Sequence, residues 1–192
     1  AEKPSLRLAP GQRITVLHAE PEPSNLTPWD VPLTVVLEDE DLLVIEKPAG
    51  MTVHPAPGHA DDTLANAVVA RWPELAGVGD PARPGIVHRL DADTSGLIVV
   101  AKSARAHSAL GTQFAERRVG KRYIALVVGS PERDEAVIDG PIGRSPRDRK
   151  KMAVVTTGRS ASTGFKVTQR FADKTLVEVR PTTGRTHQIR VH

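Results

Sequence analysis

The chain has 192 residues and a mass of 20.7 kDa, which suggests one domain, or one domain with a small appendage. It has 39% hydrophobic and 26% charged residues and no apolar run near the ~18 residues of a membrane span, so we expect neither a disordered tail nor a membrane protein. It has no cysteine, which excludes a disulfide scaffold, a Cys-ligated zinc site and thiol catalysis and fits a reducing cytoplasm.

Charge is distributed unevenly along the chain. Residues 1–82 hold 5 Lys and Arg against 13 Asp and Glu, whereas residues 83–192 hold 21 against 10. Arginine outnumbers lysine 18 to 8, and its planar fork suits bidentate contacts with phosphate. The second half of the chain therefore predicts a surface that binds a polyanion such as nucleic acid. A basic surface without a partner is the alternative.

The N-terminal part of the chain divides into three segments. Residues 1–18 are interpreted as the end of a preceding structure, and residues 19–33, with four prolines, as a linker. We expect the main domain to span residues 34–192. It opens with two β-branched runs, Thr34–Leu37 and Leu42–Ile45, which flank four turn-tolerant residues and predict a hairpin.

Capping residues and apolar periodicity predict two helices and four further strands. Thr63 and Ser103 are the expected helix caps, and Pro73 ends the first helix. The runs at 96–101 and 123–128 are wholly apolar, which is typical of buried strands, and the first is expected at a central position of its sheet. Strands outnumber helices and hairpins recur, so we expect an α+β fold with a mixed, largely antiparallel central sheet and flanking helices and loops. The expected helices are residues 63–72 and 103–118, and the further strands are residues 96–101, 123–128, 164–171 and 174–180.

The richest polar segment lies between two apolar runs, at residues 86–96. Polar residues beside buried strands tend to form loops at a sheet edge, where functional sites often lie. Asp93 is interpreted as a turn residue. Asp91 is crowded by Arg89 and bulky neighbours and needs a cationic partner. An inward-facing arginine of residues 183–192 is the candidate.

Three other chemistries fit this segment poorly. An aspartic protease needs a second similar carboxylate segment, which the sequence lacks. A serine hydrolase needs a Gly-x-Ser-x-Gly elbow, whereas Ser95 follows Asp93 by two residues and leads into a strand. The histidines of this segment and of the preceding Pro-rich loop match no metal-ligand spacing.

Three further segments carry candidate binding residues. Tyr123, the only tyrosine, opens an apolar strand and is able to stack on a base, with plain packing as the alternative. Residues 183–192 are dense in hydrogen-bond donors, which a solvated basic helix end would also show. Residues 143–151 are expected to contact phosphates without reading sequence. The basic residues of this last segment are Arg144, Arg147, Arg149, Lys150 and Lys151.

At these residues the sequence resembles the RluA-type pseudouridine synthases. The string His88–Leu97 resembles the signature of that family, and Asp41–Pro55 resembles its first conserved stretch. Lys121–Tyr123 and Gly184–His192 resemble two further motifs, in the same order and spacing. The resemblance covers residues 34–192.

The resemblance implies a role for each of five residues. Asp91 would be the essential catalytic aspartate, and Arg190 would pair with it. Arg89 would enter the RNA stack as the target uridine flips out. Tyr123 would stack on the flipped uracil, and Ile189 would wall the pocket. No metal or cofactor is implied, because the base is both leaving group and nucleophile, and the carboxylate acts either as nucleophile at C1′ or as base at C2′.

The resemblance also implies RNA as the partner, with large-subunit ribosomal RNA as the expected substrate and transfer RNA as the alternative. We expect a monomer. A non-catalytic RNA-binding or ribosome-assembly protein with the same fold is a second class, against which the intact Asp91, Tyr123 and Arg190 argue. A glycoside hydrolase would need a second carboxylate opposite Asp91. Residues 5–17 resemble the last strand of an S4 RNA-binding module, and the catalytic domain is expected to be C-terminally incomplete.

Overall fold

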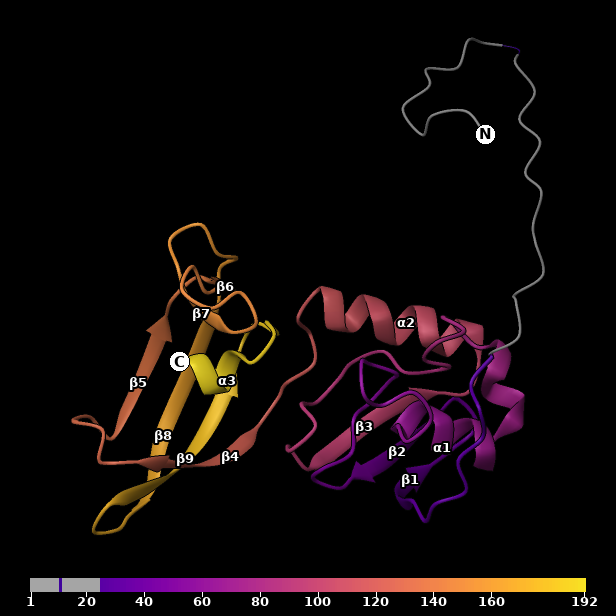
Figure 1. The fold of residues 1–192 in the computed structure, drawn as a ribbon, viewed down its shortest axis with the longest axis horizontal. Coiled ribbons are helices and arrows are strands. Elements are labelled where there is room, and N and C mark those ends of the chain that lie inside the picture. The colour runs from indigo at the N-terminus through magenta and orange to yellow at the C-terminus, as the bar shows by residue number, and fades with distance from the viewer. Residues whose placement is uncertain (1–10, 12–24) are drawn as a thin grey trace.

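The structure, a computed structural model, describes residue 11 and residues 25–192 (Figure 1). Apart from Gly11, the predicted S4-like remnant at 1–18 lies outside the described residues, as do residues 19–24 of the predicted linker. The described chain forms two lobes joined by the segment around residue 120. No helix in residues 25–192 is long and apolar enough to cross a membrane.

The first lobe packs two helices and a 3-10 helix around an antiparallel three-stranded sheet (Figure 1). β1 and β2 form the predicted hairpin, and β3 pairs with β2 along its whole length, with Lys47 opposite Gly96. β3 therefore lies at the end of the strand order, not at its centre as its apolar sequence suggested. The elements are β1 (Thr34–Glu38), β2 (Leu42–Lys47), α1 (Leu64–Arg71), η1 (Pro73–Gly77), β3 (Gly96–Ala101) and α2 (Ala104–Ala115).

Both predicted helix caps are confirmed. The hydroxyl of Thr63 accepts a hydrogen bond from the backbone N of Asn66, whose side chain in turn accepts from the backbone N of Thr63. The hydroxyl of Ser103 accepts from the backbone N of Ala106. The second helix ends at Ala115, short of the prediction, since Arg117 takes a left-handed conformation with φ 60° that a helix cannot continue through.

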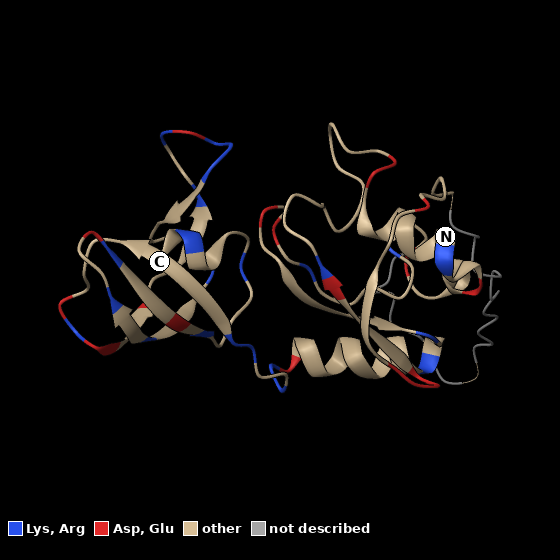
Figure 2. Ribbon diagram, turned by 90° about the horizontal axis from the view of Figure 1, so that it is seen from below, with Lys and Arg blue, Asp and Glu red and all other residues tan. Residues whose placement is uncertain are grey.

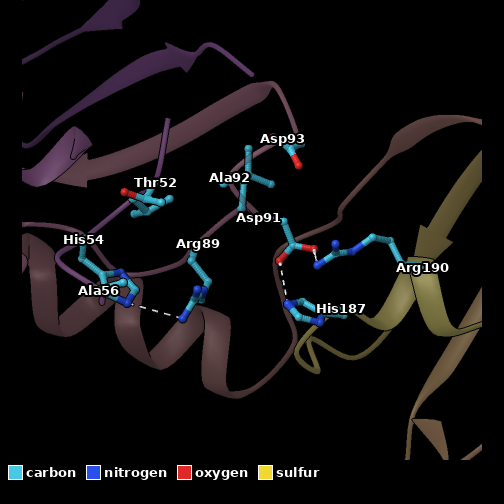
Figure 3. A pocket seen from close by; sticks show the side chains of 11 residues that line it. Thr52, His54, Ala56, Arg89, Asp91, Ala92, Asp93, His187 and Arg190 are labelled. Carbon is cyan, nitrogen blue, oxygen red and sulfur yellow. Dashed lines mark hydrogen bonds and ion pairs between the residues drawn. The ribbon is translucent and has the colours of Figure 1, made fainter. Parts of the chain in front are cut away.

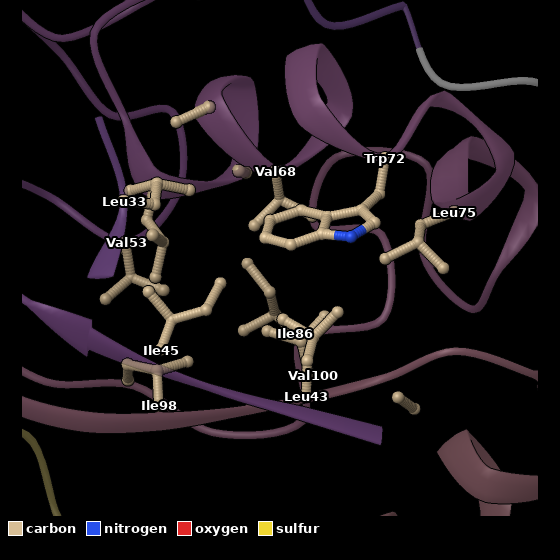
Figure 4. Packing of buried hydrophobic residues seen from close by; sticks show 14 of the residues in the cluster. Leu33, Leu43, Ile45, Val53, Val68, Trp72, Leu75, Ile86, Ile98 and Val100 are labelled. Carbon is tan, nitrogen blue, oxygen red and sulfur yellow. The ribbon is translucent and has the colours of Figure 1, made fainter. Parts of the chain in front are cut away.

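The main hydrophobic core lies in the first lobe (Figure 4). Ile45 from β2 and Ile98 from β3 are fully buried beneath Val68 of α1. Leu26, Trp29 and other residues of 26–33 also pack on this core, and the Asn66 amide donates to the carbonyl of Thr27 at 2.8 Å. The described end of the predicted linker therefore belongs to the first lobe, because its apolar side chains find a surface to cover.

The second lobe is built on an antiparallel sheet in the order β4-β9-β8-β5, beside the two-stranded β6–β7 hairpin. β8 and β9 form the second predicted hairpin. The elements of the second lobe are β4 (Tyr123–Val128), β5 (Glu135–Asp139), β6 (Ile142–Arg144), β7 (Met152–Val154), β8 (Ser162–Arg170), β9 (Lys174–Pro181) and α3 (Gln188–Val191).

The prediction of a buried strand at 123–128 is wrong. β4 is an edge strand paired only with β9 in the described sheet, and one of its faces is open. Ile124, Leu126 and Val128 on that face are 62%, 57% and 89% exposed. The predicted α+β class with antiparallel pairing is confirmed, but the strands of the described chain are divided among three sheets and do not form a single central one.

Candidate active site

Asp91 lies in the polar loop that leads into β3, where the two lobes meet (Figure 3). Its side chain is 26% exposed, and its backbone carbonyl accepts from the backbone N of Thr94, which closes the expected turn. The guanidinium of Arg190, from α3 of the other lobe, lies 2.8 Å from the carboxylate. His187 Nε2 lies 4.0 Å from the second carboxylate oxygen. The expected Asp91–Arg190 pair is therefore present.

Lys47 fixes the backbone beside Asp91 from within the first lobe. Its side chain is fully buried, and its ammonium donates to three carbonyls, those of Pro48 at 2.7 Å, Met51 at 2.8 Å and Ala92 at 2.9 Å. Burial lowers the pKa of Lys47, which the charges of Asp93 and Asp91 oppose. This lysine ties the end of β2 to the loop of Asp91, a function that its place in the first family-like stretch did not reveal.

His88 anchors the same loop from the other side. Its ring stacks on Phe114 of α2 with centroids 4.6 Å apart, and its Nε2 accepts from the backbone N of Val99 at 2.9 Å. Burial lowers the pKa of His88 to about 4, and the charge of Lys121 adds to this shift. The imidazole is therefore neutral at pH 7, with its proton on Nδ1.

This histidine is expected to make folding stability depend on acidity. An unfolded chain takes up a proton on His88 near pH 6.5, whereas the folded protein does so only near pH 4. The contribution is complete above pH 6.5 and is lost as the pH falls toward 4, by up to roughly 3 kcal/mol. Urea unfolding of the wild type and of His88→Gln, which keeps an acceptor but does not titrate, measures this. Parallel stability curves between pH 7 and 4.5 would contradict it.

Two cavities open beside Asp91, and Arg89 lines both of them. Figure 3 shows the smaller one. Nη1 of Arg89 is 3.4 Å from Nε2 of His54. Burial lowers the pKa of His54, and the charges of Arg89 and Arg83 lower it further, so a neutral His54 accepts from the guanidinium. The smaller cavity, about 340 Å³, lies between these groups, Asp91 and Arg190. Asp93, interpreted as a turn residue, also lines it.

The larger cavity, about 760 Å³, brings Asp91 together with Tyr123 and Ile189. Tyr123 opens β4 and also packs against the core of the first lobe. Burial raises the pKa of its phenol, and the charge of Asp91 raises it further, so the hydroxyl remains protonated at neutral pH. Asp91 is the only carboxylate among the described residues that line this cavity.

Gln188 holds the loop that brings Arg190 to Asp91. Its amide oxygen accepts from the hydroxyl of Thr183 at 2.8 Å and from the backbone N of Arg185 at 2.9 Å. Its amide nitrogen donates to the carbonyl of Ser162 at 3.0 Å and to the hydroxyl of Thr163 at 2.9 Å. The side chain is buried, and a polar residue in a short basic segment gave no sign of this role.

The five basic residues predicted to contact phosphates lie apart from these cavities, in the hairpin between β6 and β7 (Figure 2). Arg144 donates to the carbonyl of Arg149 at 3.4 Å, and Lys151 pairs with Asp148 at 3.7 Å. The structure thus gives the hairpin a defined form but does not bring it to Asp91. Residues 25–192 contain no cluster of three or more His, Cys, Asp or Glu side chains able to hold a metal.

A family model described as RNA pseudouridylate synthase matches residues 41–192. The chain belongs to this family. An uncharacterized RNA pseudouridine synthase of Bacillus subtilis, YlyB, is 47% identical over 192 residues, which are 100% of this chain and 63% of that protein. Ribosomal large subunit pseudouridine synthase D of Zymomonas mobilis is 49% identical over 175 residues, 90% of this chain and 55% of that protein.

A solved structure, human RNA pseudouridylate synthase domain containing 1, superposes with a TM-score of 0.70 at 28% identity, covering 84% of this chain and 64% of that one. The chain therefore spans less than two thirds of the length of these relatives. The predicted family and the α+β fold are confirmed. The individual roles of Asp91, Arg89, Tyr123, Ile189 and Arg190 stay predictions.

Proposed function

We propose that the protein isomerises uridine to pseudouridine in structured RNA, with Asp91 as the catalytic residue. One observation carries this proposal: a single carboxylate, held by an arginine from the opposite lobe, lies in a cavity otherwise lined by basic and neutral side chains. Arg190 is the cationic partner that a partly buried carboxylate at this position needs. Family membership supplies the reaction type.

In the proposed reaction, Asp91 is the one side chain that reacts with the substrate. The bond between N1 of uracil and C1′ breaks, the base turns within the cavity, C5 bonds to C1′, and the proton on C5 is lost. Asp91 acts as nucleophile at C1′ or as base at C2′. Tyr123, with its hydroxyl protonated, would offer a ring for stacking on the flipped base. Arg89, exposed at the edge of both cavities, would fill the space that the base leaves.

Large-subunit ribosomal RNA is the substrate we propose. Relatives named ribosomal large subunit pseudouridine synthase D, from Zymomonas mobilis, Xanthomonas campestris and Pseudomonas aeruginosa, are 46–49% identical to the chain. Incubation with 23S-type ribosomal RNA or transfer RNA labelled with tritium at C5 of uridine tests this. Tritium release from the ribosomal RNA is expected. Release only from transfer RNA would point to the alternative substrate, and none from either to a non-catalytic protein. The cytoplasmic location and the monomeric state stay predictions.

The β6–β7 hairpin is expected to add phosphate contacts away from the cavity. Replacing Arg147, Arg149 and Lys150 by alanine should lower the slope of log affinity against log salt by about two units, since each phosphate contact contributes somewhat under one. All RNAs should weaken about equally. Fluorescence anisotropy at several salt concentrations measures the slope. An unchanged slope would make the hairpin a solvated surface, and a loss for one RNA alone would mean that it reads sequence or shape.

A further inference from the structure

We propose that Arg117, Lys121, Arg159 and Arg185 form a phosphate site that holds the RNA backbone beside the target nucleotide. The inference rests on the proposed function and adds the place where the strand is gripped. All four side chains line the larger cavity together with Asp91. They come from three separate segments: Arg117 and Lys121 from the connection between α2 and β4, Arg159 from the turn after β7 and Arg185 from the loop after β9. Figure 2 shows basic residues gathered where the two lobes are joined.

The backbone holds two of these cations in place. The ammonium of Lys121 donates to the carbonyl of Thr183 at 3.0 Å, and Nε of Arg185 donates to the carbonyl of Ser160 at 3.0 Å. Both side chains are half-buried, whereas Arg117 and Arg159 are exposed. Lys121 and Arg185 are thus held in place before a ligand binds, and the exposed side chains of Arg117 and Arg159 are able to move toward the bound ligand.

The four cations have no acidic partner, while their neighbours do. Within the described chain, none of the four forms an ion pair. Arg118, next to Arg117, pairs with Glu116 at 2.7 Å, and Arg122, next to Lys121, pairs with Glu178 at 3.7 Å. The charges of Arg118 and Arg122, which do not line the cavity, are therefore partly neutralised, whereas the four charges at the cavity are available to an anionic ligand.

The two half-buried cations of the set are repelled by the other positive charges around them. Burial lowers the pKa of Lys121, and the charges of Arg117 and Arg185 lower it further. Burial also lowers the pKa of Arg185, and the charges of Arg159 and Arg117 lower it further. Cations held together without an anion oppose folding, so an anion bound among them is stabilised by all four.

The chemistry of the cavity selects the ligand. Guanidinium forks and an ammonium match the oxygens of a phosphate. Asp91 in the same cavity would act on the ribose of the flipped nucleotide, and a phosphodiester adjoins every ribose of an RNA strand. A backbone phosphate therefore reaches the site when the target uridine enters, and a free phosphate ion is the other source of the same chemistry.

The double variant Arg117→Gln and Arg159→Gln tests this, with Arg118→Gln and Arg122→Gln as the matched control. Both double variants remove two positive charges. Only Arg117 and Arg159 line the cavity, whereas Arg118 and Arg122 do not. Anisotropy with a fluorescein-labelled stem-loop RNA should show a salt slope lower by one to two units for the cavity variant and affinity about tenfold weaker at 0.1 M salt. The control should change the slope by less than about half a unit.

Equal weakening by both variants would mean diffuse attraction and would overturn the site, as would an unchanged cavity variant. A second measurement is thermal melting without RNA, in which the cavity variant should melt above the wild type because a repulsion is relieved, and the control should not. If 10 mM inorganic phosphate raises the melting temperature of the wild type while the cavity variant binds RNA normally, the site takes free phosphate and the RNA assignment is wrong. Tritium release by the wild type is measured separately, so a failure of the proposed isomerisation is distinguishable from a failure of this site.

Discussion

Replacing Asp91 by asparagine is expected to abolish uridine isomerisation while the fold and the RNA affinity stay close to wild type. Asparagine keeps the size of the side chain and its place in the cavity, but it offers neither a nucleophile at C1′ nor a base at C2′. Because Arg190 is 58% exposed, the lost ion pair should cost less than about 1 kcal/mol of unfolding free energy. Tritium release from RNA labelled at C5 of uridine, thermal melting and anisotropy measure the three properties.

The matched control is Asp93→Asn, two residues along the same loop. Asp93 lines the smaller cavity but not the larger one, and its charge acts on the buried ammonium of Lys47. We expect Asp93→Asn to remain active. Turnover by Asp91→Asn above about a hundredth of the wild type, or ~2.7 kcal/mol in barrier, would move the chemistry to another group. An Asp91→Asn protein that fails to fold would instead make the aspartate a structural partner of Arg190.

The elements with local signals were predicted well from the sequence. Thr63 and Ser103 are capping residues before periodic apolar positions, and both hairpins alternate around turn residues, so short-range chemistry is enough to place them. The burial of β4, in contrast, was not predicted correctly. Six apolar residues in a row do not reveal whether one face of a strand is covered, because that depends on which elements pack there.

The pairing of Asp91 with Arg190 was predicted across almost a hundred residues, because a half-buried carboxylate needs a cation and the family-like motifs supplied one. The buried ammonium of Lys47 was not predicted. Its partners are three backbone carbonyls, which every residue carries and which no sequence pattern marks.

The charge pattern of the sequence does not reveal which basic residues line the larger cavity. The hairpin at 143–151 is prominent in the sequence because five of its nine residues are basic, yet none of them lines either cavity. The cavity set takes its residues from three segments that are far apart in the sequence: Arg117 and Lys121, Arg159, and Arg185. Only the tertiary fold brings these segments together. A run of basic residues in the sequence is therefore a poor guide to where positive charge gathers in the structure.

Replacing Gln188 by leucine is expected to lower the unfolding free energy by about 3 kcal/mol and to reduce isomerisation at least tenfold, since several buried polar groups lose a partner. The hydroxyls of Thr183 and Thr163 are buried, and both bond to this amide. Leucine matches the glutamine in size but makes none of its four hydrogen bonds. Urea unfolding and tritium release measure the two effects.

The loss of activity in Gln188→Leu should result from a displaced Arg190. Gln188 does not contact Asp91, but it fixes the start of the short helix whose Arg190 pairs with that carboxylate. The control is Gln169→Leu, the same change at an exposed position of β8, which should alter stability by no more than about 0.5 kcal/mol. Turnover that falls only in proportion to the unfolded fraction would limit Gln188 to a structural role. Reduced turnover under conditions where the variant is fully folded would show that the amide network positions Arg190 at the carboxylate.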